Sequence, residues 1–282
     1  RRHGRRVRHR TRCSDRIARP RRVPGTRFRR AHGSRPTRCN STSFGWLVSP
    51  SLQEPQLTRP ATEVLHAANV TLPITNPLPP LVDPPHPPVT DPVEEPLVAV
   101  NHPRITCLEN YRHAGWQHAG RGCLLRSQVA DRLGRVADGL PDRWGLAIFD
   151  GFRPFALQVE LYEAAYADPE LPPGFFAEPD DDPTKPPPHL TGGAVDLTLT
   201  LDRVPLAPGT GFDDLTPRAH AAALEDEPGP DRDVRRILYH AMAFEGFVVF
   251  DGEWWHFEHG TRRWAAISRQ SALYGPAADP TV

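Results

Sequence analysis

Two adjacent stretches, His189-Leu-Thr-Gly-Gly193 and Ala194-Val-Asp-Leu-Thr-Leu-Thr-Leu201, decide the fold. Apolar and polar residues alternate along the second stretch, and this period predicts a half-buried β-strand over 194–201. The two consecutive glycines allow the chain to fold back just before that strand. The side chains of His189 and Asp196 can therefore meet at one point, near the start of the strand.

Further strand signals lie on both sides of this stretch. Upstream, the apolar run Leu146–Phe149 predicts a buried strand that ends at an Asp150-Gly151 turn. Downstream, Phe247–Phe250, the Asp251-Gly252 turn and Glu253–Glu258 are typical of a β-hairpin. The sequence thus supplies several strands whose partners are close enough in the chain to form an antiparallel sheet.

Helical signals alternate with these strands. Apolar residues recur at helical spacing over about 127–139 and again over about 231–244. Pro154 suits the first turn of a third helix, which runs to about residue 167. The predicted fold class is α+β: a single mixed domain with a small central antiparallel sheet flanked by helices, preceded by a disordered N-terminal region.

Charge and proline content divide the 282-residue chain. Residues 1–40 hold 16 arginines and one acidic residue, so they are expected to be a separate Arg-rich segment, disordered or a mis-called start. Ten prolines between residues 73 and 96 predict that 41–97 is an extended, poorly packed linker. The folded domain is expected over 98–275, and 276–282 is expected to be a tail.

Composition also narrows the class of protein. No apolar run approaches the roughly 18–20 residues that cross a bilayer, and no signal peptide is visible, which favours a cytoplasmic location without excluding export. Arginines in 1–40 suggest a nucleic-acid arm, but they lack interleaved aromatic residues and a helical period, so no nucleic-acid partner is expected. None of the four cysteines lies in a CxxC pair, and Cys107 and Cys123 are interpreted as buried apolar residues.

One set of side chains has the chemistry of a metal site. The two imidazoles of His189 and His256 and the carboxylate of Asp196 suit Zn²⁺ and leave a fourth position open for water. Zinc lowers the pKa of such a water towards neutrality, and a nearby carboxylate, Glu253, can accept its proton. Because residues three apart on a regular strand face opposite sides, Glu253 must precede the strand or the strand must bulge. Taken singly, each of these residues also has a plain structural interpretation.

Arg153 is a further candidate, because it stands where a strand ends and a helix begins. A cation beside the positive end of a helix suits a developing oxyanion or a substrate carboxylate. The plainer alternative is an ion pair with a neighbouring aspartate.

Three motifs follow one another in a distinctive order: Asp150-Gly-Phe-Arg153-Pro154, the His189-x6-Asp196 spacing, and Glu253-Trp-Trp-His256-Phe. Together they resemble the D-alanyl-D-alanine dipeptidases, the M15 zinc peptidases that include the vancomycin-resistance dipeptidase. The resemblance runs from about Asn110 to Trp264, and also takes in Gly209-Thr-Gly-Phe-Asp213 and Gly260-Thr-Arg-Arg-Trp264.

This resemblance implies one zinc ion per chain, bound by His189, Asp196 and His256, with Glu253 as general base and then acid. It implies that Arg153 stabilises the tetrahedral intermediate and that Asp213 lies near the free amino group of a dipeptide substrate. The implied activity is hydrolysis of D-Ala-D-Ala in bacterial cell-wall metabolism. One position departs from the family: a serine is usual two residues before the first histidine, and here Pro187 stands there.

Two alternatives remain at this level. A D,D- or L,D-carboxypeptidase acting on longer peptidoglycan peptides would use the same site with a more open groove. A non-catalytic zinc-containing binding module would need neither Glu253 nor Arg153, so the presence of both favours an enzyme. The oligomeric state is left open by the sequence.

Overall fold

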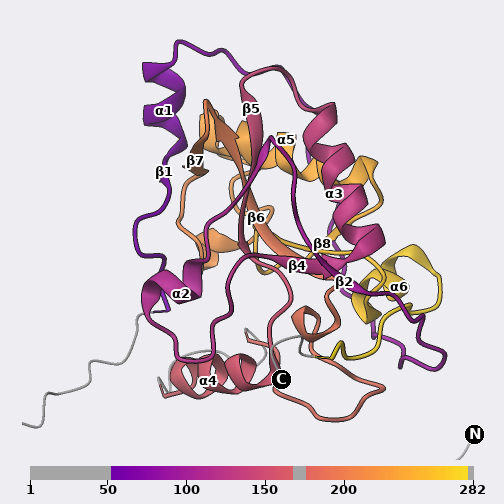
Figure 1. Ribbon diagram of the computed structural model, residues 1–282. Coiled ribbons are helices and arrows are strands. Elements are labelled where there is room, and N and C mark those ends of the chain that lie inside the picture. The colour runs from indigo at the N-terminus through magenta and orange to yellow at the C-terminus, as the bar shows by residue number, and fades with distance from the viewer. Residues whose placement is uncertain (1–51, 168–175, 279–282) are drawn as a thin grey trace, which may run out of the picture. The chain divides into compact units, whose positions relative to one another are not determined.

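The computed structural model describes residues 52–167 and 176–278 of the chain (Figure 1). The Arg-rich segment expected over 1–40 lies outside the described residues. So do 41–51 of the expected linker and 279–282 of the expected tail.

A mixed β-sheet forms the centre of the domain. Within the described residues it has seven strands, five of them in the spatial order β1 (Arg59–Pro60), β7 (Val204–Ala207), β6 (Ala194–Leu201), β5 (Trp144–Asp150) and β3 (Ile105–Cys107). The hairpin of β8 (Val248–Val249) and β9 (His256–Glu258) joins through β9, which pairs with β6. A separate antiparallel pair consists of β2 (Leu97–Ala99) and β4 (Leu124–Arg126). The α+β class is confirmed, but the sheet is larger than expected and contains two parallel pairs, β1–β7 and β3–β5.

Strand β6 holds the sheet together. It pairs with β5 along one edge, while its other edge is shared by β9 at residues 194–196 and by β7 at residues 200–201. All eight of its residues are buried, so the expectation of a half-buried strand is wrong. Polar side chains of β6 can be buried where they have hydrogen-bond partners inside the domain. Thr198 Oγ1, for example, donates to the carbonyl of Leu206 (2.7 Å).

The helices agree closely with the sequence pattern. Three that the sequence predicted are α3 (Ser127–Gly139), α4 (Phe155–Ala165) and α5 (Pro230–Phe244); the others are α1 (Ala61–Ala67), α2 (Asn110–Ala114) and α6 (Arg262–Ser268). On α3 the apolar stripe of Val129, Leu133 and Val136 is buried. Helices α3 and α5 contact each other and the sheet, whereas Figure 1 shows α4 at the end of the domain away from α1.

Residues 52–97 differ from the poorly packed linker that their proline content predicted. Strand β1 pairs with β7, and α1 buries Ala61 and Leu65 in the main core. Further along, Val89 is buried in a second cluster with Trp264 and Ala265. Proline removes backbone donors and favours an extended chain. Side chains and carbonyl groups of an extended chain can still make contacts, as the buried Val89 and the carbonyl of Pro87, which accepts from Arg262, show.

Substituting Leu65 tests whether this segment contributes to stability. Leu65→Ala is expected to lower the free energy of unfolding by about 2–5 kcal/mol, because it leaves a cavity at a buried position. Ile74→Ala in the same segment is the control, since Ile74 is fully exposed and should change stability by less than about 0.5 kcal/mol. Denaturant unfolding of both variants measures the difference; equal, near-zero changes would mean that the segment does not stabilise the domain.

Two smaller expectations concern helices and cysteines. Among the described residues, no helix combines the length and apolar character needed to cross a membrane. Cys123 is buried, as expected, whereas Cys107 is only half-buried, and both are free thiols.

Candidate active site

A tight turn and strand β6 bring His189 and Asp196 together. His189–Thr191 forms a single 3-10 turn, which Gly192 ends in the left-handed conformation (φ 71°). A side chain at Gly193 would come within 2.7 Å of the carbonyl of His259, so only glycine fits there. As a result, His189 Nε2 lies 3.2 Å from Asp196 Oδ2.

The hairpin brings in the third residue of the set. His256 is the first residue of β9 and lies directly opposite Asp196 in the β6–β9 pairing. Its Nδ1 is 2.9 Å from Asp196 Oδ1 and 3.2 Å from His189 Nε2. All three side chains are buried, with 2–4% of each residue exposed. The three residues that the sequence singled out therefore meet at one buried point, although His256 is 60 residues from Asp196 in the chain.

The donor atoms of this set suit a metal ion. Two ligand atoms at about 2.0–2.1 Å from one ion, in tetrahedral arrangement, lie about 3.3 Å apart. The observed separations of 2.9, 3.2 and 3.2 Å are close to that value. Within residues 52–167 and 176–278, His189, Asp196 and His256 are the group of histidine and acidic side chains whose ligand atoms lie within 4.8 Å of one another.

The second nitrogen of each imidazole is engaged away from this point. His189 Nδ1 lies 2.8 Å from the carbonyl oxygen of Gly151, and His256 Nε2 lies 3.0 Å from Glu258 Oε1. Both partners accept hydrogen bonds, so these nitrogens carry a hydrogen, and the facing nitrogens would present their lone pairs to a bound metal ion once they are deprotonated. Burial alone would lower the pKa of His256, but the carboxylates of Asp196 and Glu258 outweigh it and raise that pKa to about 10.

Glu253 lies beside the set without belonging to it. It precedes β9, so strand alternation does not constrain it, and its Oε2 is 3.7 Å from His256 Nδ1. This placement is the first of the two arrangements that the sequence analysis left open, a place before the strand rather than a bulge in it. Burial raises the pKa of Glu253 to about 7, with the charge of Asp196 adding to the rise and the charges of His256 and Arg153 opposing it.

Arg153 lies on the other side of the set, fixed by three side chains. Its Nε donates to Asp150 Oδ2 (2.7 Å), one terminal nitrogen donates to Gln158 Oε1 (3.0 Å), and the other donates to the hydroxyl of Tyr111 (3.2 Å). That second terminal nitrogen also lies 3.5 Å from Asp196 Oδ2. Burial would lower the pKa of Arg153, but the groups around it hold that pKa above its usual value, so the side chain stays charged.

Asp213 lines the same pocket and is buried. Its backbone is in the left-handed region (φ 56°), and its Oδ2 has no hydrogen-bond partner among the described residues. Burial, together with the nearby charges of Asp196 and Glu253, raises the pKa of Asp213 well above its usual value. A buried carboxyl oxygen without a partner, beside other carboxylates, is suited to receive a cationic group of a ligand.

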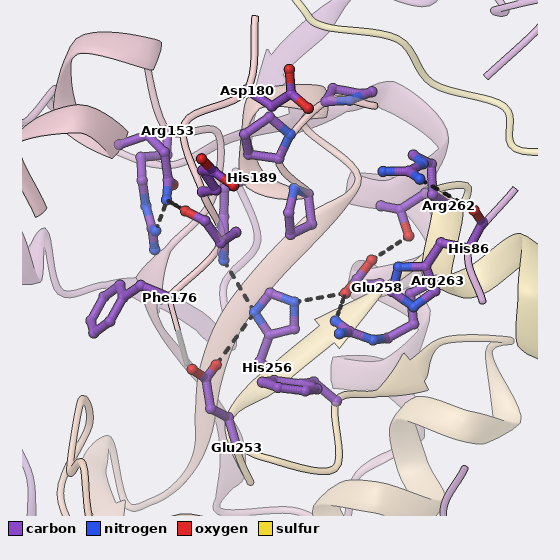
Figure 2. A pocket seen from close by; sticks show the side chains of 18 of the residues that line it. His86, Arg153, Phe176, Asp180, His189, Glu253, His256, Glu258, Arg262 and Arg263 are labelled. Carbon is purple, nitrogen blue, oxygen red and sulfur yellow. Dashed lines mark hydrogen bonds and ion pairs between the residues drawn. The ribbon is translucent and has the colours of Figure 1, made fainter. Parts of the chain in front are cut away.

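The pocket above these residues has a volume of about 270 Å³. Figure 2 shows Arg153 and His189 on one side of it, with His256 between Glu253 and Glu258. Pro187, the departure from the resembling family, lies in its wall next to His189, between two further prolines. Phe176 and His86 also line the pocket, so part of its rim comes from residues outside the three motifs.

The sequence reasoning missed several partners of these residues. Gln158 and Tyr111 come from separate helices, α4 and α2, and no motif connects them to Arg153. Glu258, by contrast, could have been predicted as a neighbour of His256 from its position in the sequence. It stands two residues after His256, and side chains two apart share one face of a strand.

Comparisons with known proteins show the family of this chain. Residues 107–271 match the family model described as D-ala-D-ala dipeptidase, Peptidase_M15, so the class of protein is a peptidase. A D-alanyl-D-alanine dipeptidase of Synechocystis sp. is 30% identical over 208 residues, which cover 61% of this chain and 84% of the relative. The chain belongs to the D-Ala-D-Ala dipeptidase family.

Proposed function

We propose that this protein is a zinc-dependent peptidase that hydrolyses the D-alanyl-D-alanine dipeptide, with a role in bacterial cell-wall metabolism. The observation that carries the proposal is the buried set of His189, Asp196 and His256, with the Glu253 carboxylate beside it. Membership of the dipeptidase family supports the substrate class. Two imidazole nitrogens and one carboxylate are a donor set typical of a catalytic zinc site.

Zinc, when bound by these three residues, lowers the pKa of a water molecule and polarises the carbonyl group of a substrate. Glu253 takes the proton of the attacking water and passes it to the nitrogen of the leaving alanine. A carboxylate suits both steps, because it can take up a proton and release it again, and burial favours the protonated form of Glu253 by raising its pKa.

Arg153 contributes a fixed positive charge in the pocket wall, next to Asp196 of the metal-binding set. The bonds to Asp150, Gln158 and Tyr111 hold the guanidinium before substrate arrives, so little reorganisation is needed when charge develops on the carbonyl oxygen. Asp213 pairs with the free amino group of the dipeptide in this proposal, which its buried, unpartnered Oδ2 among the described residues supports. Such a pairing favours a substrate with an N-terminal amine close to the scissile bond.

The experiment that tests this function compares substrates of different length and chirality. The protein is expected to release free D-alanine from D-Ala-D-Ala, much more slowly from a longer peptide that ends in D-Ala-D-Ala, and not from L-Ala-L-Ala. Preference for the longer peptide would identify a carboxypeptidase instead. No hydrolysis of any of the three, by protein loaded with zinc, would favour a binding module.

Replacing Arg153 separates oxyanion stabilisation from substrate binding. Arg153→Ala is expected to retain its metal and lower kcat by about 10²–10³-fold, the usual effect of removing one such partner. Arg135→Ala is the matched control, because Arg135 lies on α3 with about half of its side chain exposed (52%). Steady-state kinetics on both variants decide the role: a raised KM with unchanged kcat would show that Arg153 only binds substrate.

A further inference from the structure

A proline-rich stretch outside the family match lies against the candidate active site. We call residues 79–96 the strap; the family match begins only at residue 107. Backbone bonds anchor the strap at two points, from Val89 N to the carbonyl of Thr184 (2.8 Å) and from Val93 N to the carbonyl of Leu273 (2.7 Å). Arg262 Nε also donates to the carbonyl of Pro87 (2.8 Å). The strap is thus attached next to the pocket, and its His86 lines the pocket.

A chain of contacts runs from the strap to a residue of the metal-binding set. Asp83 Oδ1 accepts from Arg263 Nε (3.0 Å), and Arg263 donates through a terminal nitrogen to Glu258 Oε1. Glu258 Oε1 in turn accepts from His256 Nε2 (3.0 Å). Figure 2 shows the carboxylate of Glu258 between the imidazole ring of His256 and the guanidinium of Arg263. In each of these contacts a carboxylate accepts a hydrogen bond from a nitrogen of Arg263 or His256. The four side chains therefore connect the strap to His256 without a break.

Glu258, in the middle of this series of contacts, is buried and paired through both of its oxygens. Glu258 is 1% exposed, and Thr261 Oγ1 donates to its second oxygen. The guanidinium of Arg263 lies 4.1 Å above the ring of Phe250. Its position is therefore set by Phe250 on one side and by the two carboxylates on the other.

We propose that Glu258 is a positioning residue for His256, and that Asp83 of the strap, acting through Arg263, holds Glu258 in place and so increases the metal affinity of the site. A carboxylate that accepts the hydrogen of a metal-binding imidazole fixes its tautomer and orientation and makes its other nitrogen more basic. This inference rests on the proposed function, because it takes zinc as the ion bound. It extends that function by assigning a role to a segment that lies before the family match.

The test measures zinc affinity of the full-length protein by competition with a chelator, which needs no substrate. Glu258→Gln keeps an acceptor oxygen but removes the charge, and is expected to weaken zinc binding by about 10–100-fold. Asp83→Asn is expected to weaken it in the same direction by a smaller factor, since Arg263 keeps its bond to Glu258. Asp91→Asn, the same substitution at an exposed position of the strap, is the control and should bind zinc as the unsubstituted protein does.

The double variant separates positioning from general stabilisation. If Asp83 acts through Glu258, Asp83→Asn adds no further loss of zinc affinity to Glu258→Gln, whereas independent effects would multiply. If Glu258→Gln fails to fold, the zinc affinity of Asp83→Asn alone tests the proposal. This variant is expected to fold, because 40% of the Asp83 side chain is exposed and Arg263 keeps its bond to Glu258. Unchanged zinc affinity in Asp83→Asn, with thermal unfolding as in the control, would overturn the proposal. Unsubstituted protein that binds no zinc would overturn the metal site itself, which distinguishes the two failures.

Discussion

Glu253→Gln is expected to fold and to bind metal at full occupancy while losing turnover by roughly 10²–10⁴-fold. Glutamine has the size of glutamate and keeps one acceptor oxygen, but it does not take up a proton. Glu253 Oε2 is 3.7 Å from His256 Nδ1, so the carboxylate lies beside the metal-binding set rather than within it. Its loss should therefore spare the metal and remove the proton transfer.

Metal content and kcat measured on one preparation separate three roles of Glu253. A general base predicts full metal content with low kcat, and a metal ligand predicts loss of the metal. A solvated turn residue predicts near-normal turnover and a stability change within about 0.5 kcal/mol. Glu63→Gln, an exposed position on α1, is the matched control. Near-normal turnover with metal retained would contradict the proposed mechanism.

His256→Ala is expected to lose both the metal and all measurable turnover. The substitution removes one of three protein ligands, so the loss of affinity should exceed the about 10–100-fold that follows when a ligand only loses its hydrogen-bond partner. It also leaves the carboxylates of Asp196 and Glu258 buried without the imidazole between them, which should lower stability.

Elemental analysis after gel filtration measures this effect. The protein should carry about one zinc per chain, His256→Ala should carry almost none, and His66→Ala, an exposed histidine on α1, should be unaffected. Stoichiometric, tightly held zinc in folded His256→Ala would show that the ion is bound elsewhere.

Local patterns in the sequence predicted much of this domain. Strand β6 over 194–201 and helix α3 over 127–139 follow from periodicity alone, and the glycines before β6 explain why His189 and Asp196 meet. The same period-2 reasoning left two arrangements for Glu253, a place before its strand or a bulge in the strand, and the structure has the first. These features depend on residues within about ten positions of one another, where periodicity and turn chemistry are informative.

What the sequence did not reveal depends on contacts between distant segments. The pairing of β9 with the first half of β6, which places His256 opposite Asp196, is a tertiary choice that no local pattern specifies. The strap was mistaken for a linker because prolines leave no periodic signal, although its carbonyls and Asp83 have partners on α6. Burial of the polar face of β6 was also missed, because it depends on which distant segments of the chain cover the strand.

The most direct test of the central claim is a zinc titration of metal-depleted protein, with release of free D-alanine from D-Ala-D-Ala as the readout. The account predicts almost no turnover without metal, a linear rise on addition of zinc, and a plateau at about one zinc per chain. Full turnover by the metal-depleted protein would contradict the account, and so would stoichiometric zinc binding without any release of D-alanine.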